Sequence, residues 1–473
     1  MNTYPNKWKR FLVVAVGVFM STLDSSMVNI ALPTVMRHFH SPLPTTEWVV
    51  LSYLLTITAT LLFWGHLGDR LGRGRVYGAG MLVFALASLA CALAPSLPGL
   101  VVSRFIQGLG AAMMMATGPA IIRDSFPPEQ LGRSLGLIGM AVSLGLMSGP
   151  GLGGLLIQYF SWRALFFLTV PIGLFFYLLS RRFLSRQATA RGAAIDWPGS
   201  LLLAATLCLA TLLLTRLAGE ESSRWHLLLL AAPIPPLLAC FLYVERRVRH
   251  PLLPLDIFGD RFFCLGIASA ALSFTNLFGA IILTPFYLDR LRGLSPADIG
   301  LVMMAVPAAI MLASPLAGWL ADQVDRGRLA TAGMLVSAGA MFLLSASGRE
   351  TGLATLTGCL GLLGFGQALF LSPNSAAVLA HTPLHRTGTA AALLAAARNL
   401  GMLLGICLAT LVFTRIFRQQ TGGLDLRDYR PELADHFLTA LQGALIVAGA
   451  AGLLGAVLSW SRGRSRGEIA GKA

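Results

Sequence analysis

Residues 65–75 read GHLGDRLGRGR, and residues 318–328 read GWLADQVDRGR. Six of the eleven positions are identical at a constant offset of 253 residues. Each copy is a short charged segment that lies between two long apolar stretches. A repeat of this kind indicates two related halves in one chain. The number of apolar stretches between the copies therefore decides how the halves are arranged.

The apolar stretches are long enough to cross a membrane. The chain of 473 residues is 55% hydrophobic and 12% charged, whereas an average soluble domain is about 25% charged. Runs of about 20 apolar residues recur along the whole chain, which is the signal of transmembrane helices. The sequence therefore predicts an all-α polytopic membrane protein. We expect fourteen spans, near residues 11–32, 47–68, 76–95, 99–122, 134–157, 164–183, 197–216, 226–244, 262–288, 297–321, 329–347, 352–377, 388–414 and 437–460.

The repeat shows where spans were added. The first copy joins the second and third spans and the second copy joins the tenth and eleventh, so matching loops are eight spans apart. Two parallel six-span halves would put them six apart. We therefore expect two inserted spans between two six-helix bundles. The predicted domains are an N-terminal bundle at 1–185, a two-helix insert at 186–250 and a C-terminal bundle with a short cytoplasmic tail at 251–473.

The formal net charge of +15 is explained by membrane topology. Three of the 36 basic residues are Lys, and most lie in short loops between apolar runs. No basic stripe is interleaved with exposed aromatic residues, so we exclude nucleic acid as a partner. If the N-terminus is inside, 23 Lys and Arg fall in inside segments and 11 in outside segments. The positive-inside rule then predicts that both termini are cytoplasmic.

The sequence offers no pattern for catalysis or for metal binding. The six Cys lack metal or disulfide spacing, and all fall in or at the edge of predicted spans. No Walker motif, metal cluster or nucleophile arrangement is present. We therefore expect no enzyme, no metal and no cofactor, and we expect an ion gradient rather than ATP to supply the energy.

One carboxylate interrupts the first predicted span. Asp24 lies in STLDSSMVNIALP at 21–33, and it is the one acidic residue that we place well inside a span. Counted from Phe11 it lies about 20 Å along the helix, in the outer half of a core about 30 Å thick. A charge is expensive there, so an intramembrane acid indicates function. We predict a proton site, whose surroundings Ser26 and Asn29 help to shape; the alternative is a structural Asp bonded to neighbouring hydroxyl groups.

A buried cation is predicted at a similar depth. Arg104 lies in VVSRFIQGLGAA near the outer end of the fourth span, and Gln107 lies on the same face at i+3. Arg104 could pair with Asp24 and release it when a substrate arrives. The alternative is an Arg that extends its head to the membrane interface.

The fifth span carries regularly spaced small residues. Its segment 136–154, GLIGMAVSLGLMSGPGLGG, fits G-x8-G-x3-GP-x2-GG. Glycines at this spacing permit close helix approach and proline permits a bend, although tight packing alone would explain them nearly as well. The motif positions are Gly136, Gly145, Gly149, Pro150, Gly153 and Gly154.

Together these motifs resemble the major facilitator superfamily. GHLGDRLGRGR looks like the signature of its loop between spans 2 and 3, and the 6+2+6 count with LDSSMVNIALP is similar to its fourteen-span drug:proton antiporter family. The resemblance covers about residues 10–460. It implies a proton-transfer role for Arg104 and an exporter motif on the fifth span. Ser26 stands where that family has Thr, a mild departure because the hydroxyl remains.

The charged loops allow two interpretations. A solvated turn that obeys the positive-inside rule is the simpler one. The resemblance instead implies a cytoplasmic gate, in which Asp69 engages an Arg or a helix N-terminus across the halves and is released on switching. The gate residues so implied are Gly65, Asp69, Gly72 and Arg73, with Asp322 and Arg326 of the second copy as a weaker counterpart.

A substrate pocket is the least determined feature. Met and aromatic surfaces suit varied apolar cargo, but core packing or lipid exposure explains each residue equally well. Arg398 lies near mid-membrane, either as an anchor for backbone carbonyls, which we favour, or as a pocket cation. The candidate pocket residues are Ser26, Asn29, Gln107, Met114, Asn276, Phe365, Gln367 and Arg398.

Three functions remain. The first is a monomeric exporter in a bacterial inner membrane that exchanges protons for small lipophilic or cationic compounds, with Asp24 as the coupling carboxylate. The second is a proton-coupled exporter of one metabolite, lipid or siderophore on the same scaffold, because a fold does not determine its cargo. The third, a membrane enzyme or sensor, lacks a catalytic cluster.

Overall fold

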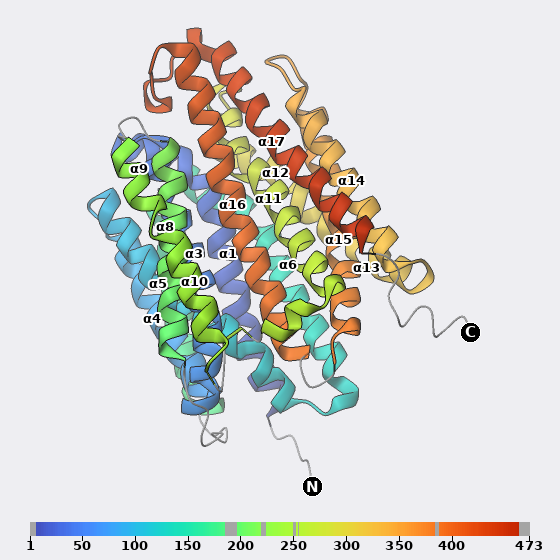
Figure 1. The fold of residues 1–473 in the computed structure, drawn as a ribbon. Coiled ribbons are helices and arrows are strands. Elements are labelled where there is room, and N and C mark those ends of the chain that lie inside the picture. The colour runs from blue at the N-terminus through green and yellow to red at the C-terminus, as the bar shows by residue number, and fades with distance from the viewer. Residues whose placement is uncertain are drawn as a thin grey trace. The chain divides into compact units, whose positions relative to one another are not determined.

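The computed structural model describes residues 6–184, 196–218, 224–248, 252–253, 255–383 and 387–462. Within these ranges, fourteen helical spans are long and apolar enough to cross a membrane (Figure 1). The predicted all-α class and the predicted number of spans are therefore confirmed. By their contacts the helices divide into two compact units.

Unit 1 comprises Met1–Val35, Trp48–Ala210 and Ala231–Leu253. Within it, α4 packs against both α5 and α7, and α3 packs against α5. Two of its helices, α1 and α8, end in residues that belong to unit 2. Its helices are α1 (Lys7–Phe39), α3 (Trp48–Leu71), α4 (Arg73–Ala92), α5 (Leu97–Ser125), α6 (Pro128–Tyr159), α7 (Arg163–Phe183), α8 (Trp197–Ala218) and α10 (Ile234–Glu245).

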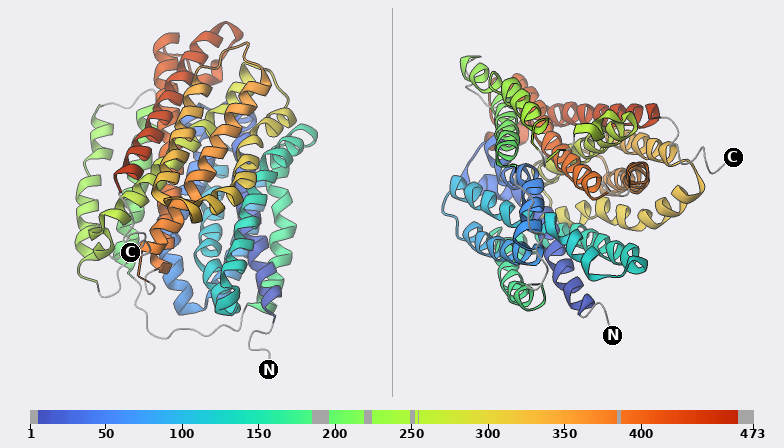
Figure 2. Two further views of the ribbon diagram at one scale, coloured as in Figure 1. Left: turned by 90° about the vertical axis from the view of Figure 1, so that its right-hand side faces the viewer. Right: turned by 60° about the horizontal axis from the view of Figure 1, so that its bottom comes forward.

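Unit 2 comprises Met36–Glu47, Thr211–Leu230 and Pro254–Ala473. Its helices repeat the packing of unit 1, because α14 packs against α15 and α17 while α13 packs against α15 (Figure 2). Its elements are α2 (Leu43–Thr46), α9 (Arg224–Ala231), η1 (Leu255–Gly259), α11 (Arg261–Arg290), α12 (Pro296–Met303), α13 (Ala305–Gln323), α14 (Arg326–Ser345), α15 (Leu353–His381), α16 (Thr387–Thr421), η3 (Leu426–Asp428), η4 (Pro431–Leu433) and α17 (Ala434–Ser461).

The same close helix crossing occurs in both units. A Cβ added to Gly80 on α4 would lie 2.8 Å from the carbonyl oxygen of Gly110 on α5. A Cβ added to Gly333 on α14 would lie 2.7 Å from the carbonyl oxygen of Gly366 on α15. Gly80 and Gly333 are 253 residues apart, which is the offset of the sequence repeat. Small residues thus set the helix spacing in both halves, as in other membrane bundles.

Proline breaks two of the predicted spans. The span predicted at 297–321 is built from α12 and α13, which meet at Met304. Pro307 has no N–H for the carbonyl of Met303, so the helix ladder is interrupted there. The span predicted at 226–244 is likewise divided into α9 and α10 at Pro233. Both remain single crossings by length and composition.

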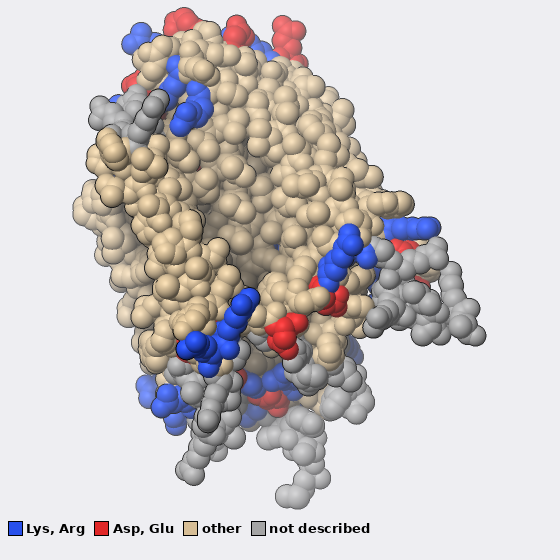
Figure 3. All heavy atoms as spheres, in the orientation of Figure 1, with Lys and Arg blue, Asp and Glu red and all other residues tan. Residues whose placement is uncertain are grey.

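The surface agrees with a membrane environment. On the face drawn in Figure 3, the sides of the helices carry uncharged residues, and the charged side chains gather near helix ends. The large hydrophobic side chains on the outside include Leu312, Trp319 and Val457, each more than half exposed. Exposed apolar side chains of this size suit contact with lipid tails.

Candidate functional site

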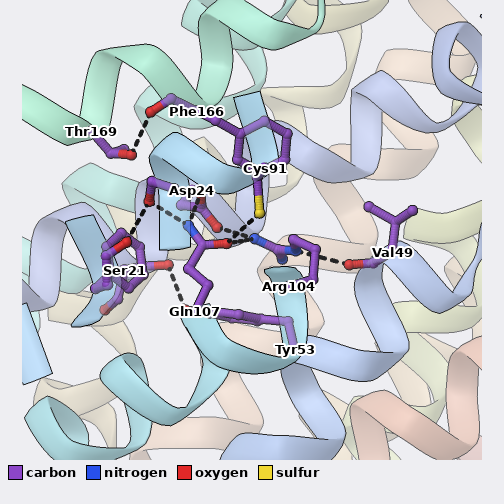
Figure 4. Close-up of polar contacts among 11 residues, drawn as sticks. Ser21, Asp24, Val49, Tyr53, Cys91, Arg104, Gln107, Phe166 and Thr169 are labelled. Atoms are coloured by element: carbon purple, nitrogen blue, oxygen red, sulfur yellow. Dashed lines mark hydrogen bonds and ion pairs between the residues drawn. The ribbon is translucent and has the colours of Figure 1, made fainter. Parts of the chain in front are cut away.

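A buried ion pair joins α1 to α5. Asp24 Oδ2 accepts a hydrogen bond from Arg104 Nη1 at 2.5 Å, and Asp24 Oδ1 accepts one from Gln107 Nε2 at 2.9 Å (Figure 4). Arg104 and Gln107 are one helical turn apart, so both side chains reach the same carboxylate. All three residues are 0% exposed. The structure therefore brings together the predicted proton site and its predicted partner.

Two further helices hold this network in place. Arg104 Nε donates to the carbonyl of Val49 in the first turn of α3 at 2.8 Å, and Gln107 Nε2 donates to Ser88 Oγ on α4 at 2.8 Å. The guanidinium lies over the ring of Tyr53, 4.2 Å from its centre. Such a cation–π contact stabilises an Arg that has lost its water. Four helices of unit 1 thus contribute to one polar cluster.

One nitrogen of the cluster is left without an acceptor. Arg104 Nη2 is buried and has no hydrogen-bond partner, although Arg carries five N–H donors. A buried donor without an acceptor costs about 1–3 kcal/mol. The cluster therefore retains the capacity to bind one more acceptor next to Asp24.

The glycines of α6 line the segment of α1 around Asp24. A Cβ on Gly145 would meet the carbonyl oxygen of Phe19 at 2.8 Å, and one on Gly149 would meet Ser26 Cβ at 2.5 Å. One on Gly153 would lie 3.2 Å from Met27 Cα. These glycines recur every four residues and form one face of α6, which we call the α6 seam. Only glycine allows the two helices to approach this closely.

The remaining motif and pocket positions of unit 1 are also placed. Ser26 Oγ donates to the carbonyl of Leu146 on α6 at 3.0 Å. Asn29 is 6% exposed, and its Oδ1 has no hydrogen-bond partner. Pro150 and Gly154 are buried. Met114 is 0% exposed, and its Cγ lies 3.2 Å from the position of a Cβ on Gly80, in the crossing of α4 and α5.

Three of the four pocket candidates of unit 2 form hydrogen bonds to neutral groups. Ser273 Oγ donates to Gln367 Oε1 at 2.7 Å, while Gln367 Nε2 is buried without a partner. Asn276 Nδ2 donates to the carbonyl of Ala448 at 3.0 Å. Arg398 Nη2 donates to Ser375 Oγ on α15 at 2.7 Å, and Phe365 is half-buried.

The charged loop of unit 1 forms its own cluster. Arg73 Nε donates to Asp69 Oδ1 at 2.7 Å, and Arg73 Nη1 donates to Asp124 Oδ2 at 2.5 Å. Gly72 connects α3 to α4 with φ of 100°, a conformation that favours glycine. A Cβ on Gly65 would meet nothing within 4 Å. In the second copy Arg326 Nη2 lies 3.7 Å from Asp322 Oδ1, again as an i, i+4 pair.

Two acidic residues, Asp124 and Glu47, were not expected from the sequence. Asp124, the second partner of Arg73, follows Arg123 at the end of α5 and carried no motif of its own. Glu47, which the sequence places at the very start of the second span, is also 0% exposed. The one-turn helix α2 extends the second span to Leu43–Leu71, so Glu47 lies within the first turns of this span.

Comparisons with known proteins agree with this architecture. The family model described as Major Facilitator Superfamily matches residues 14–405 and 263–472. A bacterial homolog to the human lysosomal transporter Spinster, solved in an inward-facing and unoccupied conformation, is similar in fold with a TM-score of 0.70. The identity is 14%, and the match covers 98% of each chain.

Several curated proteins are similar over most of their length. The riboflavin transporter RibZ of Clostridioides difficile is 35% identical and covers 87% of this chain and 89% of its own. The multidrug resistance protein Stp of Mycobacterium tuberculosis is 31% identical, with coverages of 83% and 73%. The tetracenomycin C resistance and export protein of Streptomyces glaucescens is 30% identical, with coverages of 86% and 76%.

Proposed function

Because this chain belongs to the Major Facilitator Superfamily, as its motifs predict, and is therefore a multi-pass membrane transporter rather than an enzyme, we propose that it exports small lipophilic or cationic compounds in exchange for protons. The observation that carries this proposal is the buried ion pair of Asp24 and Arg104, in which Asp24 Oδ2 lies 2.5 Å from Arg104 Nη1. The similarity to a multidrug resistance protein and to an antibiotic export protein adds support.

The pair provides a means of exchange. In the cluster Asp24 is a carboxylate whose charge is balanced by Arg104 and whose second oxygen is bound by Gln107. If Arg104 moves away, the carboxylate is left buried without a cation and takes up a proton. A cationic substrate that approaches Asp24 replaces that proton, since both carry the charge that the carboxylate needs. Proton and substrate therefore occupy the site in alternation.

The other motifs take supporting roles in this proposal. The α6 seam lets α1 move along α6, because Gly145, Gly149 and Gly153 have no side chains that would obstruct this movement. Such a movement would change the surroundings of Asp24. The cluster of Arg73 with Asp69 and Asp124 serves as a gate whose ion pairs exchange partners during switching. From the distribution of Lys and Arg we propose that both termini are cytoplasmic. We also propose a monomer in the inner membrane of a bacterium.

The first test measures proton movement in everted vesicles or proteoliposomes with an imposed proton gradient. Ethidium, a lipophilic cation, is added, and proton leakage is recorded for the wild type and for Asp24→Asn. We expect leakage that depends on ethidium in the wild type and none in Asp24→Asn. Glu432→Gln is the matched control, since Glu432 is an exposed acid in η4, and it should keep wild-type leakage.

Leakage that persists in Asp24→Asn would show that the proton travels elsewhere and that Asp24 is structural. A second candidate follows from the 35% identity to the riboflavin transporter: a carrier for one defined metabolite, such as a flavin. Riboflavin added in the same assay separates the two. If riboflavin causes proton leakage and none of the lipophilic cations does, the proposal of multidrug export is replaced by this narrower function.

A further inference from the structure

A second buried carboxyl lies at the junction of α2 and α3. Glu47 follows the single turn Leu43–Thr46, and its backbone N–H donates to the carbonyl of Leu43 at 3.0 Å. The residue is 0% exposed. Neither carboxyl oxygen has a hydrogen-bond partner. Glu47 is thus as deeply buried as Asp24, but it has no counterpart of the Arg104 and Gln107 side chains that bind the Asp24 carboxylate.

The surroundings of Glu47 within unit 2 come from α16. Cys407 and Thr410, one turn apart, face the carboxyl, and the Thr410 hydroxyl approaches it without closing a well-aligned hydrogen bond. Both residues are buried. Cys407 is the titratable group that faces Glu47 from this helix, and within the described residues no Lys, Arg or His pairs with it. Arg37, ten residues earlier, is bound to Asp289 at 2.5 Å.

An ionised carboxylate cannot remain in such a place at low cost. Burying an unpaired charge costs several kcal/mol even after relaxation, whereas a neutral carboxylic acid carries its own donor and can bond to a hydroxyl. A metal ion is not favoured either, because one carboxyl group and isolated hydroxyls provide too few oxygen ligands for a hard cation. The surroundings therefore suit a protonated acid.

We propose that Glu47 is a second proton-binding carboxyl of the transport cycle: it is neutral while α2 packs against α16, and it loses its proton when the two helices separate. The inference rests on the proposed proton coupling. The chain connects the two acids, because Glu47 lies two residues before Val49, whose carbonyl binds Arg104. Under the predicted topology, Glu47 lies at the outer end of its span, on the side from which protons enter.

The protonation state can be read without any substrate. Difference infrared spectroscopy of purified protein, titrated with base, should show the carbonyl stretch of a protonated carboxylic acid in the wild type. This band should be weaker in Glu47→Gln than in the wild type, unchanged in Asp24→Asn and partly shifted in Glu47→Asp. A band of equal size in the wild type and in Glu47→Gln would overturn the proposal. Size-exclusion profiles confirm that each variant is folded.

Coupling is tested separately by proton release. Ethidium is added to detergent-solubilised protein in weakly buffered solution, and protons released per bound ethidium are counted. We expect Glu47→Gln to release fewer protons than the wild type, with the control Glu432→Gln unchanged. Equal release in the wild type and Glu47→Gln would refute the coupling role of Glu47 while proton-driven export stands. No release from the wild type with any cation would instead refute the proposed function.

Discussion

Unit 1 buries an ion pair where unit 2 buries a neutral amide. Asp24 lies nine residues before Pro33, which is inside α1, and Asn276 lies nine residues before Pro285, which is inside α11. Ser337 Oγ donates to Asn276 Oδ1 at 2.8 Å, and the Asn276 amide donates to the carbonyl of Ala448. The two first helices of the halves therefore carry polar groups at matching places, but only the group in unit 1 is charged.

The residues at matching positions of α5 and α15 also differ, because they are charged or polar in unit 1 and apolar in unit 2. Arg104 and Gln107 precede Gly110 by six and three residues, and Leu360 and Leu363 precede the matching Gly366 by the same intervals. Both leucines are 1% exposed. The same helix packing is thus completed in unit 2 by neutral and apolar side chains. Since buried ion pairs are weak contributors to stability, this difference supports the proposal that the charges in unit 1 serve transport rather than folding.

The largest expected effect comes from removing one charge. Arg104→Leu copies the residue of unit 2 but leaves Asp24 buried without its cation, which should cost about 3–5 kcal/mol of folding free energy. The double variant Asp24→Asn/Arg104→Leu copies unit 2 on both helices and should recover most of this loss, while its ethidium-driven proton leakage stays absent. Thermal unfolding in detergent and the vesicle assay measure the two effects.

A double variant that remains as unstable as Arg104→Leu would mean that the ion pair itself holds unit 1 together. Recovery of stability without recovery of transport would separate the two roles. Leu360→Ala is the matched comparison in unit 2, because it removes packing without exposing a charge.

A smaller effect is expected at the α6 seam, which places Asp24. Gly149→Ala puts a Cβ 2.5 Å from Ser26 Cβ, and overpacking of this kind costs about 1–3 kcal/mol. Gly136→Ala, at a motif position where a Cβ would meet nothing within 4 Å, should be neutral. The unfolding temperatures and leakage rates of the two variants are compared. Equal effects would show that the spacing of the motif, rather than contact with α1, is what matters.

Features that depend on local sequence could be predicted, and features that depend on contacts between distant segments could not. The length of apolar runs predicts the spans and their repeat, and the cost of burying a charge predicts that Asp24 pairs with Arg104. The Val49 carbonyl could not be predicted as a partner, because any backbone carbonyl of a neighbouring helix could serve. Glu47 was missed because its burial depends on α2, a single turn without a periodic signal of its own.

The smallest effects are expected at the charged loops, where the two copies also differ. Arg73 binds two acids at 2.7 and 2.5 Å, whereas Arg326 lies 3.7 Å from one. Partly exposed ion pairs contribute about 0–1 kcal/mol, so Arg73→Ala should lower the unfolding temperature slightly and Arg326→Ala should not.

Salt distinguishes this electrostatic effect from lost packing. At about 1 M salt the Debye length falls to about 3 Å, so the destabilisation by Arg73→Ala should shrink toward that of Arg326→Ala. A loss that is independent of salt would mean that the Arg73 side chain acts by packing against α3 and α5. If Arg73→Ala instead reduces ethidium-driven leakage at unchanged stability, the cluster acts as the proposed gate in unit 1, and the weaker pair of unit 2 should then be dispensable for transport.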